Sequence, residues 1–216
     1  PPAGSTYRVT RASLVMRALV ACAARAPLRA PLLAVRVRPT PRAHLACTPT
    51  PCEPLLHIVL FEPQIPPNTG TIGRLSLATR CRLHLIEPLG FDIDDKALRR
   101  AGMDYWAQVD CMQHPSWEAY LATARPERVW LFTTKGQQAH WHGRYRCGDH
   151  LLFGNEGHGA PPWMHDWIRE QHGDAHRVRL PMSTEVAGRS LNLANTVSCA
   201  VYEGLRQLNE REPIPF

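Results

Sequence analysis

Three short polar segments carry the residues of this chain that could do chemistry. In the first, Asn68-Thr-Gly-Thr-Ile-Gly-Arg74, an arginine follows a helix-starting asparagine by about one and a half turns. An arginine in that place can bind a phosphate through two parallel hydrogen bonds. The same spacing also fits an asparagine that only caps the helix, followed by a solvent-exposed arginine. Spacing alone leaves both interpretations open.

The second segment is the glycine-rich Gly154-Asn-Glu-Gly-His-Gly159. Glycines after a buried strand allow the backbone to approach a ligand closely, although an ordinary tight turn has the same composition. The order G-x-x-G-x-G is the reverse of the dinucleotide fingerprint, which argues against a nicotinamide oxidoreductase. Glu156 and His158 could form an acid–base pair. With His140 and His142 they match no metal-ligand spacing, so we expect no metal.

The third segment consists of Leu180-Pro-Met182 and, after a polar loop, Ser190-Leu-Asn-Leu-Ala-Asn195. Ser190 and Asn192 could cap the helix that begins here. Asn195 falls in an apolar helical pattern and is therefore expected to be buried. A buried amide needs hydrogen-bond partners, which a ligand or a loop backbone would supply. Ser190 is not expected to be a nucleophile, because no G-x-S-x-G elbow surrounds it.

The elements that must position these segments alternate from Leu55 onward. Short apolar runs predict strands at 55–61, 83–86, 108–112, 128–133, 150–153 and 178–181. Helices are predicted between them, at about 70–80, 94–101, 115–124, 163–171 and 191–208. This alternation predicts an α/β fold whose mostly parallel sheet carries helices on both faces. Ligands of such sheets bind beyond the carboxyl ends of the strands, where the three polar segments fall.

Charge and composition divide the chain at about residue 54. Residues 1–54 hold eight arginines, one acidic residue and nine prolines, whereas residues 55–216 hold 17 basic and 18 acidic residues. We interpret 1–54 as a disordered or spurious extension, with an arginine-rich targeting segment as the alternative, and 55–216 as the folded domain. Because that domain carries almost no net charge, any RNA-binding surface on it requires clustered cations.

Cysteine usage indicates a reducing compartment, and hydropathy indicates a protein that does not contact a membrane. The seven cysteines are odd in number and contain no C-x-x-C, so we expect reduced thiols and a cytoplasmic location. Cys81 and Cys199 fall in apolar helical patterns and are expected in the core. No apolar stretch approaches the roughly 20 residues that span a bilayer, so we expect no membrane partner.

Together these segments resemble the SPOUT superfamily of RNA methyltransferases. More narrowly, they are similar to the bacterial tRNA (cytidine/uridine-34) 2′-O-methyltransferases. The resemblance covers about 155 residues, and residues 1–54 have no part in it. The resemblance is specific because three motifs occur together, although no single one would be specific: PPNTG at 66–70, RRAGMDYW at 99–106 and SLNLANTVS at 190–198.

The resemblance implies a deep trefoil knot near the C-terminus, formed by the loops after strands 128–133, 150–153 and 178–181. These loops would hold S-adenosylmethionine in a bent shape, read mostly by backbone groups. By position, the cofactor-binding residues would be Phe132, Thr133, Gly154, Glu156, Leu180, Met182, Ser190 and Asn195. The resemblance also implies a homodimer whose active site lies near the interface.

Arg74 matches the essential arginine of the family, and Tyr202 matches a tyrosine near its active site. A guanidinium with a pKa above about 12 is a poor base. We therefore expect Arg74 to bind a phosphate and to favour the developing alkoxide. Lys135, Arg99 and Arg100 are the expected contacts to the tRNA anticodon stem-loop. The implied activity is 2′-O-methylation of the wobble nucleotide, C34 or U34.

One departure from the narrower family concerns the glycine-rich loop. At Gly157-His158 the wobble-modifying enzymes usually carry a bulkier residue and then a basic one, and the loop here is closer to that of other ribose-methylating SPOUT enzymes. Methylation at another tRNA position or in rRNA is therefore one alternative. A non-catalytic RNA-binding SPOUT protein is another, against which Arg74 and Asn195 argue.

Overall fold

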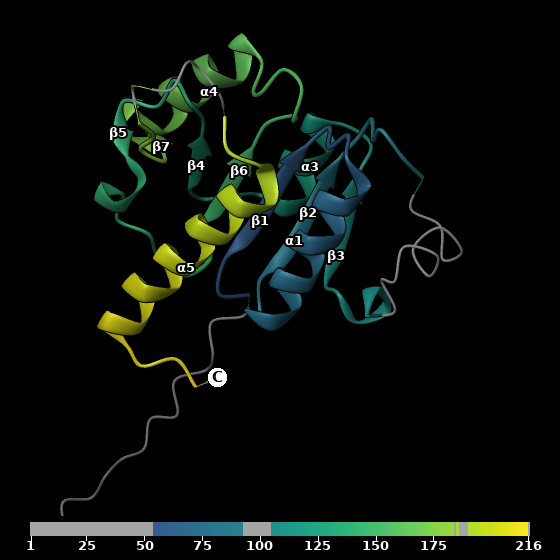
Figure 1. Ribbon diagram of the computed structural model, residues 1–216, viewed down its shortest axis with the longest axis horizontal. Coiled ribbons are helices and arrows are strands. Elements are labelled where there is room, and N and C mark those ends of the chain that lie inside the picture. The colour runs from purple at the N-terminus through teal and green to yellow at the C-terminus, as the bar shows by residue number, and fades with distance from the viewer. Residues whose placement is uncertain (1–53, 93–104, 184, 186–189, 216) are drawn as a thin grey trace, which may run out of the picture. The chain divides into compact units, whose positions relative to one another are not determined.

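The computed structural model describes residues 54–92, 105–183, 185 and 190–215, all within the compact unit Cys47–Phe216. In this part of the chain seven strands form one sheet in the order β3-β2-β1-β6-β4-β7-β5, and every neighbouring pair is parallel (Figure 1). This arrangement confirms the predicted α/β class. The strands are β1 (His57–Phe61), β2 (Arg82–Ile86), β3 (Cys111–His114), β4 (Val129–Phe132), β5 (Gln138–Ala139), β6 (His150–Phe153) and β7 (Arg177–Arg179).

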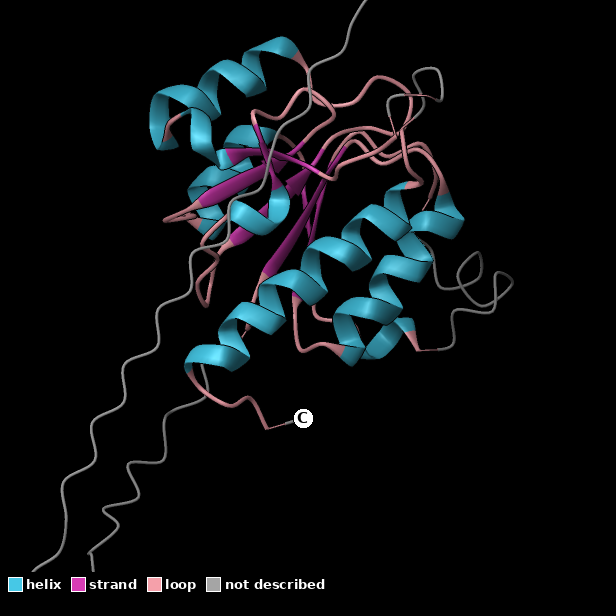
Figure 2. Ribbon diagram, turned by 60° about the vertical axis from the view of Figure 1, so that its left-hand side comes forward, coloured by secondary structure: helices cyan, strands magenta, loops and turns pink. Residues whose placement is uncertain are grey.

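Helices cover both faces of this sheet, as predicted (Figure 2). On one face α1 and α5 lie side by side in Figure 1, and the other face carries α3 and α4. The helices are α1 (Pro66–Ala78), α3 (Trp117–Ala124), α4 (Pro162–His172) and α5 (Leu193–Arg211), with short 3-10 turns at Trp106–Gln108, His140–His142 and Asp174–His176. The helix predicted at 94–101 lies outside the described residues.

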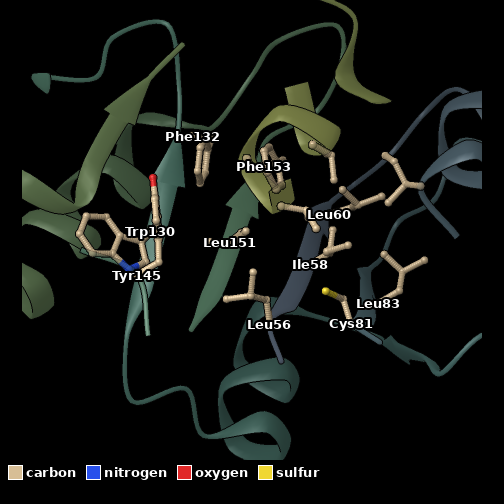
Figure 3. Packing of buried hydrophobic residues seen from close by; sticks show 14 of the residues in the cluster. Leu56, Ile58, Leu60, Cys81, Leu83, Trp130, Phe132, Tyr145, Leu151 and Phe153 are labelled. Carbon is tan, nitrogen blue, oxygen red and sulfur yellow. The ribbon is translucent and has the colours of Figure 1, made fainter. Parts of the chain in front are cut away.

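Side-chain alternation along the strands builds a separate core on each face. Leu56, Ile58 and Leu60 belong to the cluster that packs under α1 and α5, which Figure 3 shows from close by. Val59 and Phe61, one position out of phase, belong to the cluster under α3 and α4. Both clusters are made of fully or almost fully buried side chains. The sheet is therefore a rigid platform for the loops at its carboxyl edge.

The start of α1 differs from the prediction. Pro66 and Pro67 occupy the first helical turn, where a missing N–H costs nothing and the fixed φ is already helical. The helix therefore begins four residues before the expected start, and Asn68 lies inside its first turn instead of capping it. The cap position is Ile65, which makes no side-chain capping bond. As a result the Asn68 amide is available for contacts outside the helix.

The cysteines only partly follow the prediction. Cys81 is buried in the core, as expected, but Cys199 is exposed on α5. The prediction that Cys199 lies in the core is wrong, because the buried stripe of α5 runs through Val197, Ala200 and Val201 instead. Cys147 is disulfide-bonded, contrary to the expectation of thiols alone.

Two further expectations concern the chain path and the membrane. Of the loop that follows β7, residues 184 and 186–189 lie outside the described residues, so the trefoil knot stays a prediction. The extension predicted at 1–54 lies outside them as well, apart from Pro54. Among the helices described, none has the length and apolar character that crossing a membrane demands.

Candidate active site

The loops after β4, β6 and β7 meet the start of α5 around a cavity of about 470 Å³ at the carboxyl edge of the sheet. Seven of the eight residues predicted to bind a cofactor line this cavity. They are Phe132, Thr133, Gly154, Glu156, Leu180, Met182 and Ser190. Residues from four separate segments of the sequence thus converge on one pocket, as the strand-end rule for parallel sheets predicts.

Asn195 is the eighth predicted residue, and it does not line the cavity. Asn195 is exposed, and its backbone N–H donates to Asn192 Oδ1 over 3.2 Å. The expectation of a buried amide is wrong because Ala194 and Val197 form the buried stripe at this end of α5, and Asn195 lies on the outward face. Thr196, the next residue, lines the cavity instead.

Gly154 has its place in the pocket because two stretches of backbone nearly touch there. A Cβ atom at this position would lie 2.2 Å from the Ala160 nitrogen and 2.3 Å from the Gly159 carbonyl carbon. Gly159 itself has φ +71°, which favours glycine. Asn155 closes the loop from within, because its Oδ1 accepts the N–H of Gly157 over 2.7 Å. These contacts give the glycine-rich loop one defined shape.

Glu156 was predicted to contact a cofactor, but its carboxylate is engaged by the segment that leads into α1. The N–H groups of Gln64 and Ile65 donate to it over 2.8 and 3.3 Å. The Asn68 side-chain amide also donates to it, over 3.1 Å. Glu156 therefore lines the pocket mainly as the residue that fixes the glycine-rich loop to the start of α1.

Asn68 extends this connection to the last helix. Its Oδ1 accepts a hydrogen bond from Asn192 Nδ2 over 2.9 Å, and Asn192 Oδ1 caps α5. The chain Glu156–Asn68–Asn192 thus joins three segments that are far apart in sequence. Sequence reasoning treated both asparagines as caps and missed their contact with each other. The available signal was that both follow predicted strands whose carboxyl ends share one edge.

Arg74 and Tyr202, the predicted catalytic residues, do not line the cavity. Arg74 is exposed on α1, six residues after the pocket residue Asn68, or about 9 Å along the helix axis. Its guanidinium lies 4.6 Å from the centre of the Tyr105 ring, and the Tyr105 hydroxyl donates to the Gly70 carbonyl over 2.8 Å. Tyr202 is 59% exposed on α5. The structure thus orients Arg74 by a cation–π contact and leaves Tyr202 at the surface.

Of the predicted RNA contacts, Lys135 is exposed in the turn after β4, next to the pocket residues Thr133 and Thr134. Its backbone N–H donates to Thr133 Oγ1 over 3.2 Å. A cation at the rim of the pocket is well placed to meet a phosphate. Arg99 and Arg100 lie outside the described residues.

The histidines considered in the sequence analysis, His140, His142 and His158, are not the ones that the structure brings together. His57, His84 and His150 each offer a ring nitrogen, and these three atoms lie within 4.8 Å of one another. The expectation of no metal considered only His140, His142, His158 and Glu156. His57 and His150 are the first residues of β1 and β6, so their cluster lies at the opposite end of the strands from the pocket.

Comparisons with known proteins agree with this architecture. The family model described as the SpoU rRNA Methylase family matches residues 55–202. A tRNA (cytidine(34)-2′-O)-methyltransferase of Yersinia pestis is 47% identical over 159 residues, which cover 71% of this chain and 94% of the relative. The protein of the same name from Escherichia coli K12 is 46% identical over 154 residues, again 71% and 94% of the two chains.

Two solved structures are similar over the same region. A putative RNA methyltransferase of Bacillus anthracis shares 40% identity with a TM-score of 0.64, covering 71% of this chain and 94% of that one. A structure described as giving insight into 2-OH methylation of C/U34 on tRNA shares 41% identity with a TM-score of 0.62, covering 72% and 97%.

Proposed function

The chain belongs to the SpoU rRNA Methylase family, and on that premise we propose that it methylates the ribose 2′-hydroxyl of nucleotide 34 of tRNA, with S-adenosylmethionine as the methyl donor. The observation that carries the proposal is the high identity to tRNA (cytidine(34)-2′-O)-methyltransferases over nearly their whole length. We extend the substrate to uridine 34 on the similarity to the structure concerned with C/U34. We also propose a cytoplasmic location, with which a tRNA substrate is consistent.

The cavity has the size and lining that the methyl donor needs. Its volume of about 470 Å³ falls within the range of about 300–1,000 Å³ that is typical of small-molecule sites. Phe132, Leu180 and Met182 supply apolar walls for an adenine, and Gly154 and its loop supply backbone groups. A bound sulfonium carries an already activated methyl group, so positioning by these loops supplies much of the rate acceleration.

Arg74 would act on the substrate through its positive charge. Within the described part of the chain its guanidinium donates no hydrogen bond and lies over the Tyr105 ring, so its N–H groups are available to a phosphate. Binding the phosphate beside the target ribose would orient the 2′-hydroxyl. The same charge would stabilise the alkoxide that develops as the hydroxyl attacks. Lys135 would add a second contact to the RNA.

A homodimer is part of the proposal. Leu77 on α1 and Tyr202 on α5 are large hydrophobic side chains that are 38% and 59% exposed, and the two helices pack against each other. A second copy of the chain would cover these residues. The exposed position of Tyr202 then becomes a position at the interface, which accounts for its absence from the pocket of the single chain.

The test is transfer of labelled methyl groups from the donor into total tRNA, followed by mass spectrometry of the product to identify the methylated nucleotide. Transfer should occur at nucleotide 34 and disappear in Arg74→Ala. The control Arg169→Ala removes an exposed arginine of α4, on the other face of the sheet, and should leave transfer unchanged. Methylation at another nucleotide would contradict the proposed target. Donor binding without transfer to any RNA would instead favour a non-catalytic RNA-binding protein.

A further inference from the structure

Four histidines form a diagonal row across the sheet face that α3 covers. They lie on four adjacent strands: His114 on β3, His84 on β2, His57 on β1 and His150 on β6. His84, His114 and His150 are at most 3% exposed, and His57 is half-buried at the amino edge of the sheet. Buried imidazoles must find partners for both ring nitrogens, so a row of this kind requires an explanation.

Two outer contacts orient the row. His84 Nδ1 lies 2.9 Å from His114 Nε2, and His150 Nδ1 lies 2.7 Å from the Tyr120 hydroxyl. When each Nδ1 carries the proton, it donates to that neighbour, and Nε2 of the same ring keeps its lone pair. Partners of this kind beyond the ligands are what fixes the tautomer and the orientation of metal-binding histidines.

We propose that His57, His84 and His150 bind a borderline divalent transition-metal ion, for which Zn²⁺ is the representative. Their nitrogens already lie within 4.8 Å of one another. A tetrahedral ion with Zn–N bonds of about 2.0–2.1 Å holds its nitrogens about 3.4 Å apart. The wider gaps must therefore close, while the 2.9 Å between His57 Nδ1 and His84 Nε2 must widen slightly. Three imidazoles with one open position for water form a ligand set that Zn²⁺ accepts, and imidazole suits this class of ion generally.

The inner contacts show what must move when the ion binds. His57 Nδ1 lies 2.9 Å from His84 Nε2, so the pair shares one proton in the metal-free protein. His57 would release that proton from Nδ1 and take one up at Nε2 from water, leaving both rings neutral. The His57 and His150 rings stack 3.9 Å apart at 7°. Because a nitrogen lone pair lies in the plane of its ring, this stack must tilt open.

The surroundings keep the imidazoles in the form that binds metal. Burial, with a smaller effect of Arg82, lowers the pKa of His57 to about 4. Burial lowers the pKa of His84 to about 3 and that of His150 to about 2, so protons do not compete for these nitrogens near neutral pH. The positive charge of Arg82 is paired with Asp110 over 2.8 Å.

The experiment uses the full chain, stripped of metal with EDTA and titrated with Co²⁺ as a spectroscopic substitute for Zn²⁺. We expect one equivalent to bind with the intense visible bands of a tetrahedral ion and without a thiolate-to-cobalt charge-transfer band, since all protein ligands are nitrogen. His57→Asn, a substitution at the half-buried rim, should abolish this spectrum. The control His142→Gln removes an exposed histidine and should preserve it.

Tyr120→Phe gives a second measurement in a protein that keeps all three ligands. Loss of its hydrogen bond to His150 should weaken Zn²⁺ or Co²⁺ binding about 10- to 100-fold. Zn²⁺ should also raise the midpoint of thermal unfolding of the wild type but not of His57→Asn. Failure of the wild type to bind Co²⁺, or a spectrum dominated by thiolate ligation, would overturn the proposal. Both results are independent of methyl transfer.

Discussion

At the scale of single residues, Gly154 shows how the backbone itself makes the pocket. The glycine-rich loop folds back so closely there that even one methyl group would meet backbone atoms of Gly159 and Ala160. Backbone atoms cannot turn aside as a side chain can, so the whole loop would have to shift. The shape of the cavity therefore depends on a residue that has no side chain at all.

Gly154→Ala should weaken binding of S-adenosylmethionine about 10- to 100-fold. The reason is an overpacking cost of about 1–3 kcal/mol, of which each 1.4 kcal/mol expressed in binding is about tenfold. Isothermal titration calorimetry measures the affinity directly. Gly157→Ala is the matched control in the same loop, because a Cβ there meets only the Asn155 side-chain oxygen, at 3.2 Å. Equal affinities in the two variants would contradict this account.

At the scale of elements, α5 divides its residues between two tasks. Val201 is fully buried against the sheet, while its neighbour Tyr202 is 59% exposed. One turn of the helix thus contributes both to the core and to the surface that we propose as a dimer interface. An aspartate placed at position 201 or at position 202 should therefore affect the core in one case and the proposed interface in the other.

Val201→Asp should destabilise the fold by about 3–5 kcal/mol, because it buries a charge without a partner. Tyr202→Asp should leave the stability of the monomer nearly unchanged but shift the protein from dimer to monomer. Chemical denaturation and analytical ultracentrifugation measure the two effects. A Tyr202→Asp protein that remains fully dimeric would argue against an interface on this face of α5.

The elements also show how far sequence reasoning reached. Apolar runs located β1, β4 and β6 well, because both faces of these strands are buried. The helical period of the apolar residues located the buried stripe of α5. The start of α1 was misplaced because Asn68 has the composition of a cap, whereas Pro66-Pro67 begins the helix. Asn195 was misjudged because it is adjacent to the stripe without belonging to it.

The histidine row was missed for a different reason. Its members are separated by up to 93 residues in the sequence, from His57 to His150, and none has a motif around it. Only the strand order β3-β2-β1-β6 makes them neighbours. A pattern search along the chain cannot detect a contact that depends on which strands are adjacent. The pocket was easier to predict, because all strand ends of a parallel sheet share one edge.

At the scale of the whole molecule, the buried histidines predict a loss of stability in acid. Their pKa values are lowered in the folded state, with burial the largest cause, whereas the unfolded chain binds protons with a pKa near 6.5. The unfolded state therefore takes up more protons as pH falls from about 6.5 towards 4, and stability decreases. Urea unfolding in EDTA should show this decrease, and less of it in His57→Asn. A wild-type midpoint that stays constant from pH 7 to 4.5 would contradict the prediction.

The predicted division of the chain at residue 54 gives a second prediction at this scale. The family match begins at residue 55, and the charge and proline content change there. A chain that lacks residues 1–54 should keep its methyl transfer within experimental error, and its unfolding midpoint should match that of the full chain under reducing conditions, in which Cys147 forms no disulfide. Loss of solubility or of methyl transfer in the shortened chain would show that residues 1–54 are needed for folding or activity.

The hydrogen bonds from Glu156 through Asn68 to Asn192 connect the glycine-rich loop, the start of α1 and the start of α5. Helix α1 also carries Arg74. A ligand that orders these connected segments lowers the ordering cost for a second ligand that contacts them, so we expect the two binding events to be coupled. Occupancy of the pocket should raise the affinity for tRNA, and tRNA should raise the affinity for the methyl donor by the same factor. Asn68→Ala removes the hydrogen bonds to Glu156 and Asn192. This variant should bring the coupling factor close to one, while each ligand still binds alone.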